Sequence, residues 1–136
     1  MNHLEIEYKT MLTEAEHKQL LSFFHDVQPV SQINYYIDSA DFALRDARMA
    51  LRVRTTPEDA EFTLKIPQPL GNFEYNQILS KDETKEILEH LQFPQGEILD
   101  KLQEKKIPVD KLTILGTLEN IRYEKQDAIG LFALDE

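Results

Sequence analysis

Several short segments of this 136-residue chain alternate apolar and ionic side chains, and this alternation constrains the fold more than any other feature. Leu51 and Val53 alternate with Arg52 and Arg54, and a similar period of two runs through residues 4–9 and 61–66. Successive side chains of a β-strand point to opposite faces of its sheet. The sequence therefore predicts strands with one apolar face, packed against other elements, and one strongly ionic face.

The rest of the chain predicts an α+β fold with roughly seven or eight antiparallel strands and three helices. Ser, Thr and Glu spaced as capping boxes at residues 13–16 and 80–83 predict two of the helix starts. The expected strands cover residues 4–9, 32–38, 49–55, 61–66, 73–79, 111–118, 120–126 and 130–135. The expected helices cover residues 14–26, 80–91 with the cap, and 97–105, with a short helical turn within 39–48.

Composition excludes several classes of function. The formal net charge of −10 argues against generic binding to a nucleic-acid backbone, which requires a basic surface. The chain has no cysteine, which excludes disulfides, thiolate catalysis and cysteine-ligated metal centres. No apolar run approaches the roughly 20 residues that span a bilayer, and the acidic N-terminus is unlike a signal peptide. We expect a cytoplasmic protein without nucleic-acid or membrane partners.

The ionic faces predict a site that binds something charged. Arg52 and Arg54 would share one face of a strand and repel each other unless an anion lies between them. Glu5 and Glu7 would lie about 7 Å apart along a strand, a spacing at which two carboxylates can share a divalent cation. A metal ion with Arg and Lys side chains is the usual equipment for binding a polyphosphate. Taken singly, each of these segments is more often a solvated strand face, so the prediction depends on their joint occurrence.

The order of these motifs along the chain resembles the CYTH domain, or triphosphate tunnel metalloenzyme, superfamily. The opening Glu5-Ile6-Glu7-Tyr8-Lys9 resembles the family's ExExK signature, and the likeness continues to the end of the chain. The later matching segments are Tyr36-x-Asp38, Leu44, Ala50-Leu51-Arg52-Val53-Arg54, Thr63-Leu64-Lys65, Gly116-Thr117-Leu118 with Arg122, and Gly130-Leu131-Phe132-Ala133-Leu134-Asp135. The chain is most similar to the short, single-domain bacillus-type members, which are often labelled adenylate cyclases.

The resemblance implies a single CYTH-like domain over residues 1–136, built as an antiparallel β-barrel of about eight strands with helices outside. Family members usually continue past the equivalent of Asp135 with further strand and helix, so we expect an incompletely closed barrel here. Three interpretations of the short C-terminus stay open: a fragment, a naturally short member, or closure by a second chain, as in a homodimer.

The resemblance also implies a metal-dependent hydrolase of triphosphate-bearing substrates, either inorganic triphosphate or a nucleoside or other organic triphosphate, with Mg²⁺ or Mn²⁺ as cofactor. Its residue assignments are as follows: Glu5 and Glu7 as metal-binding and catalytic carboxylates; Lys9 as an orienting or acid–base group; Lys9, Arg52, Arg54, Lys65 and Arg122 as phosphate-binding groups; and Glu74 and Asp135 as further inward-facing acids near the metal. The alternatives are an adenylate cyclase, a non-catalytic triphosphate- or polyphosphate-binding module, and an acidic interaction domain with solvated charges.

Overall fold

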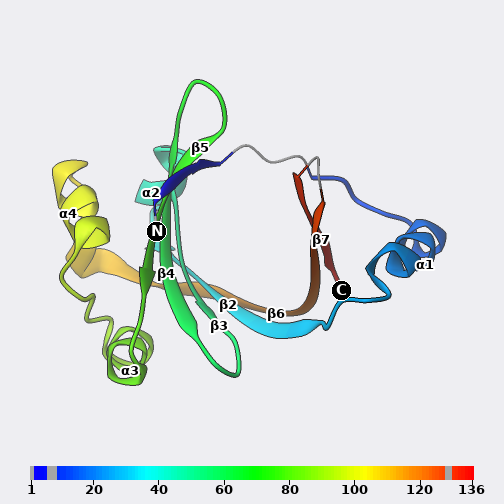
Figure 1. Ribbon diagram of the computed structural model, residues 1–136. Coiled ribbons are helices and arrows are strands. Elements are labelled where there is room, and N and C mark those ends of the chain that lie inside the picture. The colour runs from blue at the N-terminus through cyan, green and yellow to red at the C-terminus, as the bar shows by residue number, and fades with distance from the viewer. Residues whose placement is uncertain (1, 6–8, 128–129) are drawn as a thin grey trace.

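The computed structural model describes residues 2–5, 9–127 and 130–136, and its framework is one curled antiparallel sheet (Figure 1). Within these residues the sheet has seven strands in the order β1-β5-β4-β3-β2-β6-β7. The strands are β1 (His3–Glu5), β2 (Val30–Ser39), β3 (Ala50–Thr55), β4 (Ala60–Pro67), β5 (Asn72–Ile78), β6 (Leu112–Asp127) and β7 (Gly130–Asp135). The edge strands β1 and β7 are not paired with each other in the described chain, so the expected α+β fold with an incompletely closed barrel is confirmed.

The helices lie outside the curled sheet (Figure 1). They are α1 (Glu14–Leu21), α2 (Ala43–Asp46), α3 (Lys81–His90) and α4 (Glu97–Glu104), with short 3₁₀ segments at Ser22–Phe24 and Val109–Lys111. Both predicted capping boxes are present, with Thr13 capping α1 and Ser80 capping α3. The first helix ends earlier than the expected residue 26, because the Ser22 hydroxyl donates to the Gln19 carbonyl at 2.7 Å and the backbone tightens into the 3₁₀ turn.

The main hydrophobic core lies between the convex face of the sheet and helices α2, α3 and α4. Its strand members are the apolar partners of the alternating segments, such as Leu51 and Val53 from β3, which are 2% and 0% exposed. The other members are Ile37, Leu44, Met49, Phe62, Leu64, Ile66, Leu79, Ile87, Ile98, Leu102, Ile107 and Leu112. Since apolar side chains fill the convex side, the alternate side chains of the same strands line the concave side.

A smaller aromatic cluster holds α1 and the following 3₁₀ turn against the far end of the sheet. The Phe23 ring packs edge-on against Phe24 and Phe132, at centroid distances of 5.1 and 5.5 Å. Phe24 also contacts Tyr123 of β6, with 6.3 Å between ring centroids. Edge-to-face pairs at these distances are favourable for aromatic rings. This cluster fixes β6 and β7 as the second wall of the curled sheet.

Asp38, at the end of β2, organises the turn that leads into α2. Its carboxylate accepts hydrogen bonds from the backbone N–H groups of Ser39, Leu44 and Arg45 at 2.8, 2.9 and 3.1 Å. The side chain is only 9% exposed, so these three donors have no easy access to water as an alternative acceptor. Asp38 is therefore a structural residue that anchors the helical turn expected within residues 39–48.

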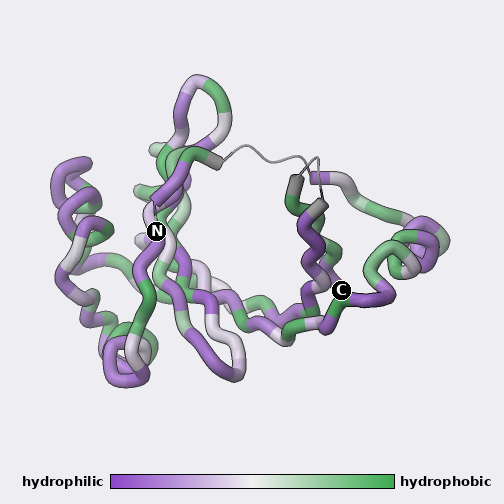
Figure 2. The backbone as a smooth tube through the Cα atoms, in the orientation of Figure 1, coloured by the Kyte–Doolittle hydropathy of each residue, from purple (hydrophilic) through white to green (hydrophobic). Residues whose placement is uncertain are grey.

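The two strands expected at residues 111–118 and 120–126 are a single 16-residue strand, β6, and that part of the prediction is wrong. The pairing with β2 shifts between Tyr36, which faces Gly116, and Ile37, which faces Ile114, leaving Leu115 as an extra residue. A bulge of this kind bends a strand without ending its hydrogen-bonded ladder. The end of β6 that belongs to the second wall carries mostly hydrophilic residues (Figure 2).

The strand expected at residues 4–9 is observed as His3–Glu5, and residues 6–8 lie outside the described chain. Within the described residues, no helix is both long and apolar enough to cross a membrane.

Candidate functional site

Strand register brings the predicted phosphate-binding residues of β3 and β4 to the concave face of the sheet. Arg52 lies between Tyr36 of β2 and Thr63 of β4, and Arg54 lies between Asn34 and Glu61. Residues directly opposite each other in neighbouring strands share a face. Two polar rows therefore cross the inside of the curled sheet, with one arginine at the middle of each row.

The two arginines are crowded, and the carboxylate of Glu61, opposite Arg54 on β4, attracts Arg54 without forming an ion pair. Neither Arg52 nor Arg54 forms an ion pair within the described chain, whereas Lys65 and Arg122 do. Burial, with the nearby charges of Arg52 and Arg122, lowers the pKa of Arg54 to about 10. The Nε of Arg52 is buried and has no hydrogen-bond partner in the part of the chain that the structure describes. This arrangement has the electrostatic character of an anion-binding site.

Arg54 is held in place by a pair of amides that sequence reasoning did not single out. Its Nε donates to Oδ1 of Asn34 at 2.7 Å, and Nδ2 of Asn34 donates to Oδ1 of Asn120 at 3.2 Å. Asn34 is 3% exposed. The only sequence signal for this residue is its alternation with Gln32 and Tyr36, which places three polar side chains on one face of β2.

The second wall contributes Arg122 from β6 and Asp135 from β7. They are paired in register and form a bidentate ion pair, with Nε–Oδ1 and Nη2–Oδ2 distances of 2.7 and 2.8 Å. The hydrogen bonds from Arg122, supported by the charges of Arg54 and Lys9, lower the pKa of Asp135 below its ordinary value. Lys9 precedes α1 and lies outside any helix or strand, and its charge adds to the lowering of that pKa.

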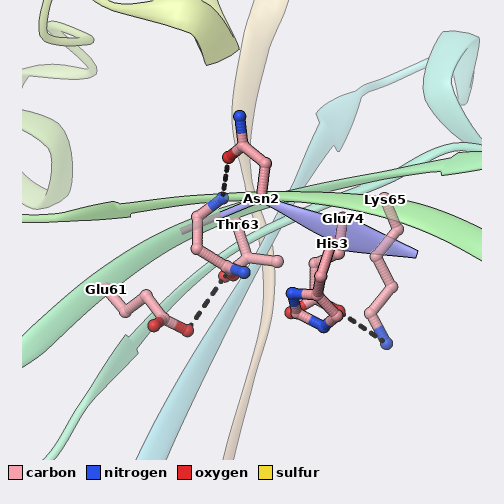
Figure 3. Close-up of polar contacts among 7 residues, drawn as sticks. Asn2, His3, Glu61, Thr63, Lys65 and Glu74 are labelled. Atoms are coloured by element: carbon pink, nitrogen blue, oxygen red, sulfur yellow. Dashed lines mark hydrogen bonds and ion pairs between the residues drawn. The ribbon is translucent and has the colours of Figure 1, made fainter. Parts of the chain in front are cut away.

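The opposite wall contributes Lys65 and Glu74 (Figure 3). Nζ of Lys65 lies 3.6 Å from Oε2 of Glu74, and the two side chains are only 16% and 8% exposed. Nε2 of His3 lies 3.9 Å from the other oxygen of the same carboxylate. Glu74 is therefore a buried acid on the concave face with a basic side chain on each side, and its assignment to the metal stays a prediction.

A hydroxyl and an amide complete the polar lining beside Arg52. The Thr63 hydroxyl lies 2.9 Å from Oδ1 of Asn76 and 3.2 Å from Oε1 of Glu61, and Figure 3 shows the contact with Glu61. The backbone N–H of Asn76 donates to Oδ1 of Asn2 at 3.2 Å, which ties the N-terminal segment to β5. These contacts link β4, β5 and the N-terminal segment, and Glu61 brings a negative charge to the concave face opposite Arg54.

The predicted metal carboxylates are only partly described. The backbone of Glu5 pairs with Asn72 of β5, two positions from the pairing of His3 with Glu74. Glu7 lies outside the described residues. Within the described chain, no three His, Asp or Glu side chains converge as a metal cluster. Of the acids that the sequence assigned to the metal on this wall, Glu74 is the one whose side chain is described.

A cavity of about 340 Å³ adjoins Arg54 at the end of the concave face near the β3–β4 turn. It is lined by Arg54, Thr56, Asp59, Ala60, Glu61 and Ile78. A larger depression lies on the convex side near α3 and α4, and it contains none of the predicted site residues. The chemistry of the side chains, and not the size of the hollow, identifies the concave face as the candidate site.

A curled antiparallel sheet with external helices and a cationic, acid-flanked inner face defines a class of phosphate-binding half-barrels. The CYTH domain family model matches residues 3–136, and the chain belongs to this family. It is 34% identical over 134 residues to the Bacillus subtilis protein named "Putative triphosphatase YjbK", a match that covers 97% of this chain and 69% of that protein.

Two solved structures support the fold. A Bacillus halodurans protein described as a "putative adenylate cyclase" superimposes with a TM-score of 0.92 at 39% identity, covering 98% of this chain and 73% of the other. The Hippeastrum protein HpAC1, whose description reports a dominant triphosphatase activity, superimposes with a TM-score of 0.75 at 19% identity, covering 92% and 68%. The second likeness concerns the fold alone.

Proposed function

We propose that this protein is a metal-dependent hydrolase of triphosphate-bearing substrates. The observation that carries the proposal is the inward-facing pair Arg52 and Arg54, which forms no ion pair in the described chain and includes a buried donor without an acceptor. Phosphate oxygens would supply that acceptor and offset the repulsion between the two charges. The 34% identity to a protein named as a triphosphatase supports the same chemistry.

In this proposal each cationic side chain binds phosphate in a way that depends on the partner it has in the ligand-free structure. Arg52 and Arg54 bind non-bridging phosphate oxygens directly and stabilise the charge that develops during phosphoryl transfer. Arg122 and Lys65 are paired with Asp135 and Glu74, so they bind phosphate by exchanging or sharing those carboxylates. Lys9 keeps its predicted role as an orienting or acid–base group.

The donor chemistry fits a hard divalent cation. Mg²⁺ is usually held by one or two carboxylates together with substrate phosphate oxygens, so a cluster of three protein ligands is not required. Glu74 would hold the ion with Glu5 and Glu7, and Asp135 would lie on the far wall. When bound, Mg²⁺ or Mn²⁺ supplies charge neutralisation for the phosphate oxygens and activation of water.

The cavity beside Arg54 supports an organic triphosphate as well as the inorganic one. Its volume of about 340 Å³ leaves room beyond the arginine pair, and Ile78 offers an apolar surface that is 67% exposed. Burying such a surface against an organic group would be favourable. A cytoplasmic location, a single domain over residues 1–136 and the absence of a nucleic-acid partner stay predictions from the sequence.

The test is phosphate release from inorganic triphosphate, ATP and thiamine triphosphate, with Mg²⁺, with Mn²⁺ and with a chelator. We expect metal-dependent release by the wild-type chain and a loss of at least about tenfold in Glu5→Gln and Lys65→Ala. Lys105→Ala, which removes an exposed lysine at the end of α4, is the matched control and should act as wild type. Equal turnover in all four proteins would contradict the assigned roles.

The same protein samples distinguish triphosphatase activity from two other functions, adenylate cyclase activity and binding without catalysis. The Bacillus halodurans relative described as an adenylate cyclase motivates a measurement of cyclic AMP beside phosphate from one ATP incubation. A non-catalytic binding module would bind triphosphate in calorimetry and release no phosphate under any metal condition. Predominant cyclic AMP, or binding without turnover, would each replace the triphosphatase proposal.

A further inference from the structure

The inward-facing cations differ in the kind of partner that holds them. Lys65 and Arg122 are held by the carboxylates of Glu74 and Asp135, whereas Arg54 is held by the neutral amide of Asn34. A carboxylate both orients and neutralises a cation, but an amide oxygen orients it without removing its charge. The amide partner of Arg54 therefore leaves the full positive charge of this side chain available for binding an anion, whereas Glu74 and Asp135 partly neutralise Lys65 and Arg122.

The direction of the Asn34 amide follows from donor and acceptor chemistry. The guanidinium of Arg54 offers only donors, so Oδ1 of Asn34 must face its Nε, at the observed 2.7 Å. The Nδ2 group then faces Oδ1 of Asn120, at 3.2 Å, and this second contact opposes rotation of the amide. Asn34 is 3% exposed, so water offers little competition for either contact.

The contact uses the Nε of Arg54 and leaves its two terminal amino groups for a ligand. Those groups form the planar fork that matches two oxygens of one phosphate group. The side chain is half-buried, and Arg52 and Arg122 each repel it more strongly than Glu61, opposite it on β4, attracts it, so without a fixed acceptor the guanidinium would turn toward solvent. Asn34 opposes that movement while the positive charge stays available.

We propose that Asn34, oriented by Asn120, is a positioning residue that presents the guanidinium of Arg54, which no ion pair holds in the described chain, to the phosphate groups of the substrate. This inference rests on the proposed function, because it assumes that a triphosphate is the ligand of the concave face. It predicts that the affinity for triphosphate depends on the neutral charge of the residue at position 34 as much as on its hydrogen bond to Arg54.

The experiment compares Asn34→Ala, which removes the acceptor, with Asn34→Asp, which keeps the acceptor and adds a charge. Calorimetric binding of inorganic triphosphate is measured for both, with and without Mg²⁺. The matched control is Gln32→Glu, which adds the same charge two residues away on the same face of β2, where the register sets position 32 opposite Asn120 and position 34 opposite Arg54. We expect a loss of affinity of about tenfold or more for both position-34 variants, and a smaller loss for the control.

A spectroscopic measurement separates positioning from general destabilisation. Solvent exchange of the Arg54 Nε–H proton, followed by nuclear magnetic resonance without ligand, should be slow in the wild-type chain and fast in Asn34→Ala. In Asn34→Asp it should be slow again, while affinity stays low. A loss of folding alone cannot produce a protected Nε–H together with weak binding.

The outcomes distinguish this inference from the proposed function. Failure of the wild-type chain to bind triphosphate would reject both. Wild-type binding that Asn34→Asp leaves unchanged, or weakens no more than Gln32→Glu does, would overturn the positioning role alone. Equal exchange of the Arg54 Nε–H in wild type and Asn34→Ala would also overturn it, because the hydrogen bond would then be absent in solution.

Discussion

Replacement of Arg52 by methionine is expected to stabilise the ligand-free protein while weakening its binding of triphosphate. The Nε of Arg52 is buried without a hydrogen-bond partner in the described chain, and its charge opposes that of Arg54. A buried donor without an acceptor costs about 1–3 kcal/mol, and methionine keeps most of the apolar stem. Since Arg52 is only half-buried, we expect the lower end, an increase of about 1 kcal/mol in the free energy of unfolding.

The assay is urea unfolding followed by circular dichroism, with and without inorganic triphosphate and Mg²⁺. A ligand at about 100 times its Kd stabilises the native state by about 2.7 kcal/mol, so the wild-type chain should gain this amount. Arg52→Met should gain much less, and the order of stability of the two proteins should therefore reverse when ligand is added. Lys105→Met removes an exposed charge and should stay within about 0.5 kcal/mol of wild type in the absence of ligand.

The reasoning is refuted if Arg52→Met is no more stable than wild type without ligand while the Lys105 control behaves as expected. That result would mean that Arg52 finds a favourable environment in the ligand-free protein. The crowding of positive charge would then no longer argue for an anion as the natural occupant of the concave face.

Three further substitutions test the packing and the electrostatics around the site. Asp38→Ala strips three buried N–H groups of their acceptor and should lower the free energy of unfolding by about 3 kcal/mol in urea; a loss below about 1 kcal/mol would contradict its anchoring role. Asp135→Asn should cost less than about 1 kcal/mol at neutral pH, because the ion pair with Arg122 is partly exposed. Since the pKa of Asp135 is lowered on folding, that difference should be present above the ordinary value of 3.8 and disappear as the pH falls through the lowered pKa; a difference that persists in stronger acid would contradict this assignment. Ser80→Ala removes the cap of α3 and should cost about 1 kcal/mol in thermal unfolding, and no change would show that the cap is dispensable.

Local patterns in the sequence predict the elements well where one face is buried. The alternation of Leu51 and Val53 with Arg52 and Arg54 suffices to place β3 and to assign its two faces, because burial enforces the period of two. The two capping boxes likewise locate the starts of α1 and α3, since their hydrogen bonds are made within four residues. Family membership and the curled sheet, expected from the motif order, are confirmed.

Contacts between distant segments could not be predicted in the same way. The role of Asn34 depends on the register that sets it opposite Arg54, and a register is a property of two strands and not of one. The pairing of Arg122 with Asp135 has the same origin. The metal-binding roles of Glu5 and Glu7 stay predictions, because neither side chain belongs to the described part of the structure.

Leu115, the extra residue in β6, determines which side chains of that strand point to the concave face of the sheet. Before Leu115 the even-numbered Leu112 and Ile114 pack into the convex core, whereas after it the odd-numbered Tyr123 packs outward and the even-numbered Arg122 points inward. Without that residue, one uninterrupted alternation could not satisfy both halves of the strand. A single deletion there would exchange the inner and outer surfaces of β6 in the second wall, so the inward position of Arg122 depends on one irregular position that carries no charge itself.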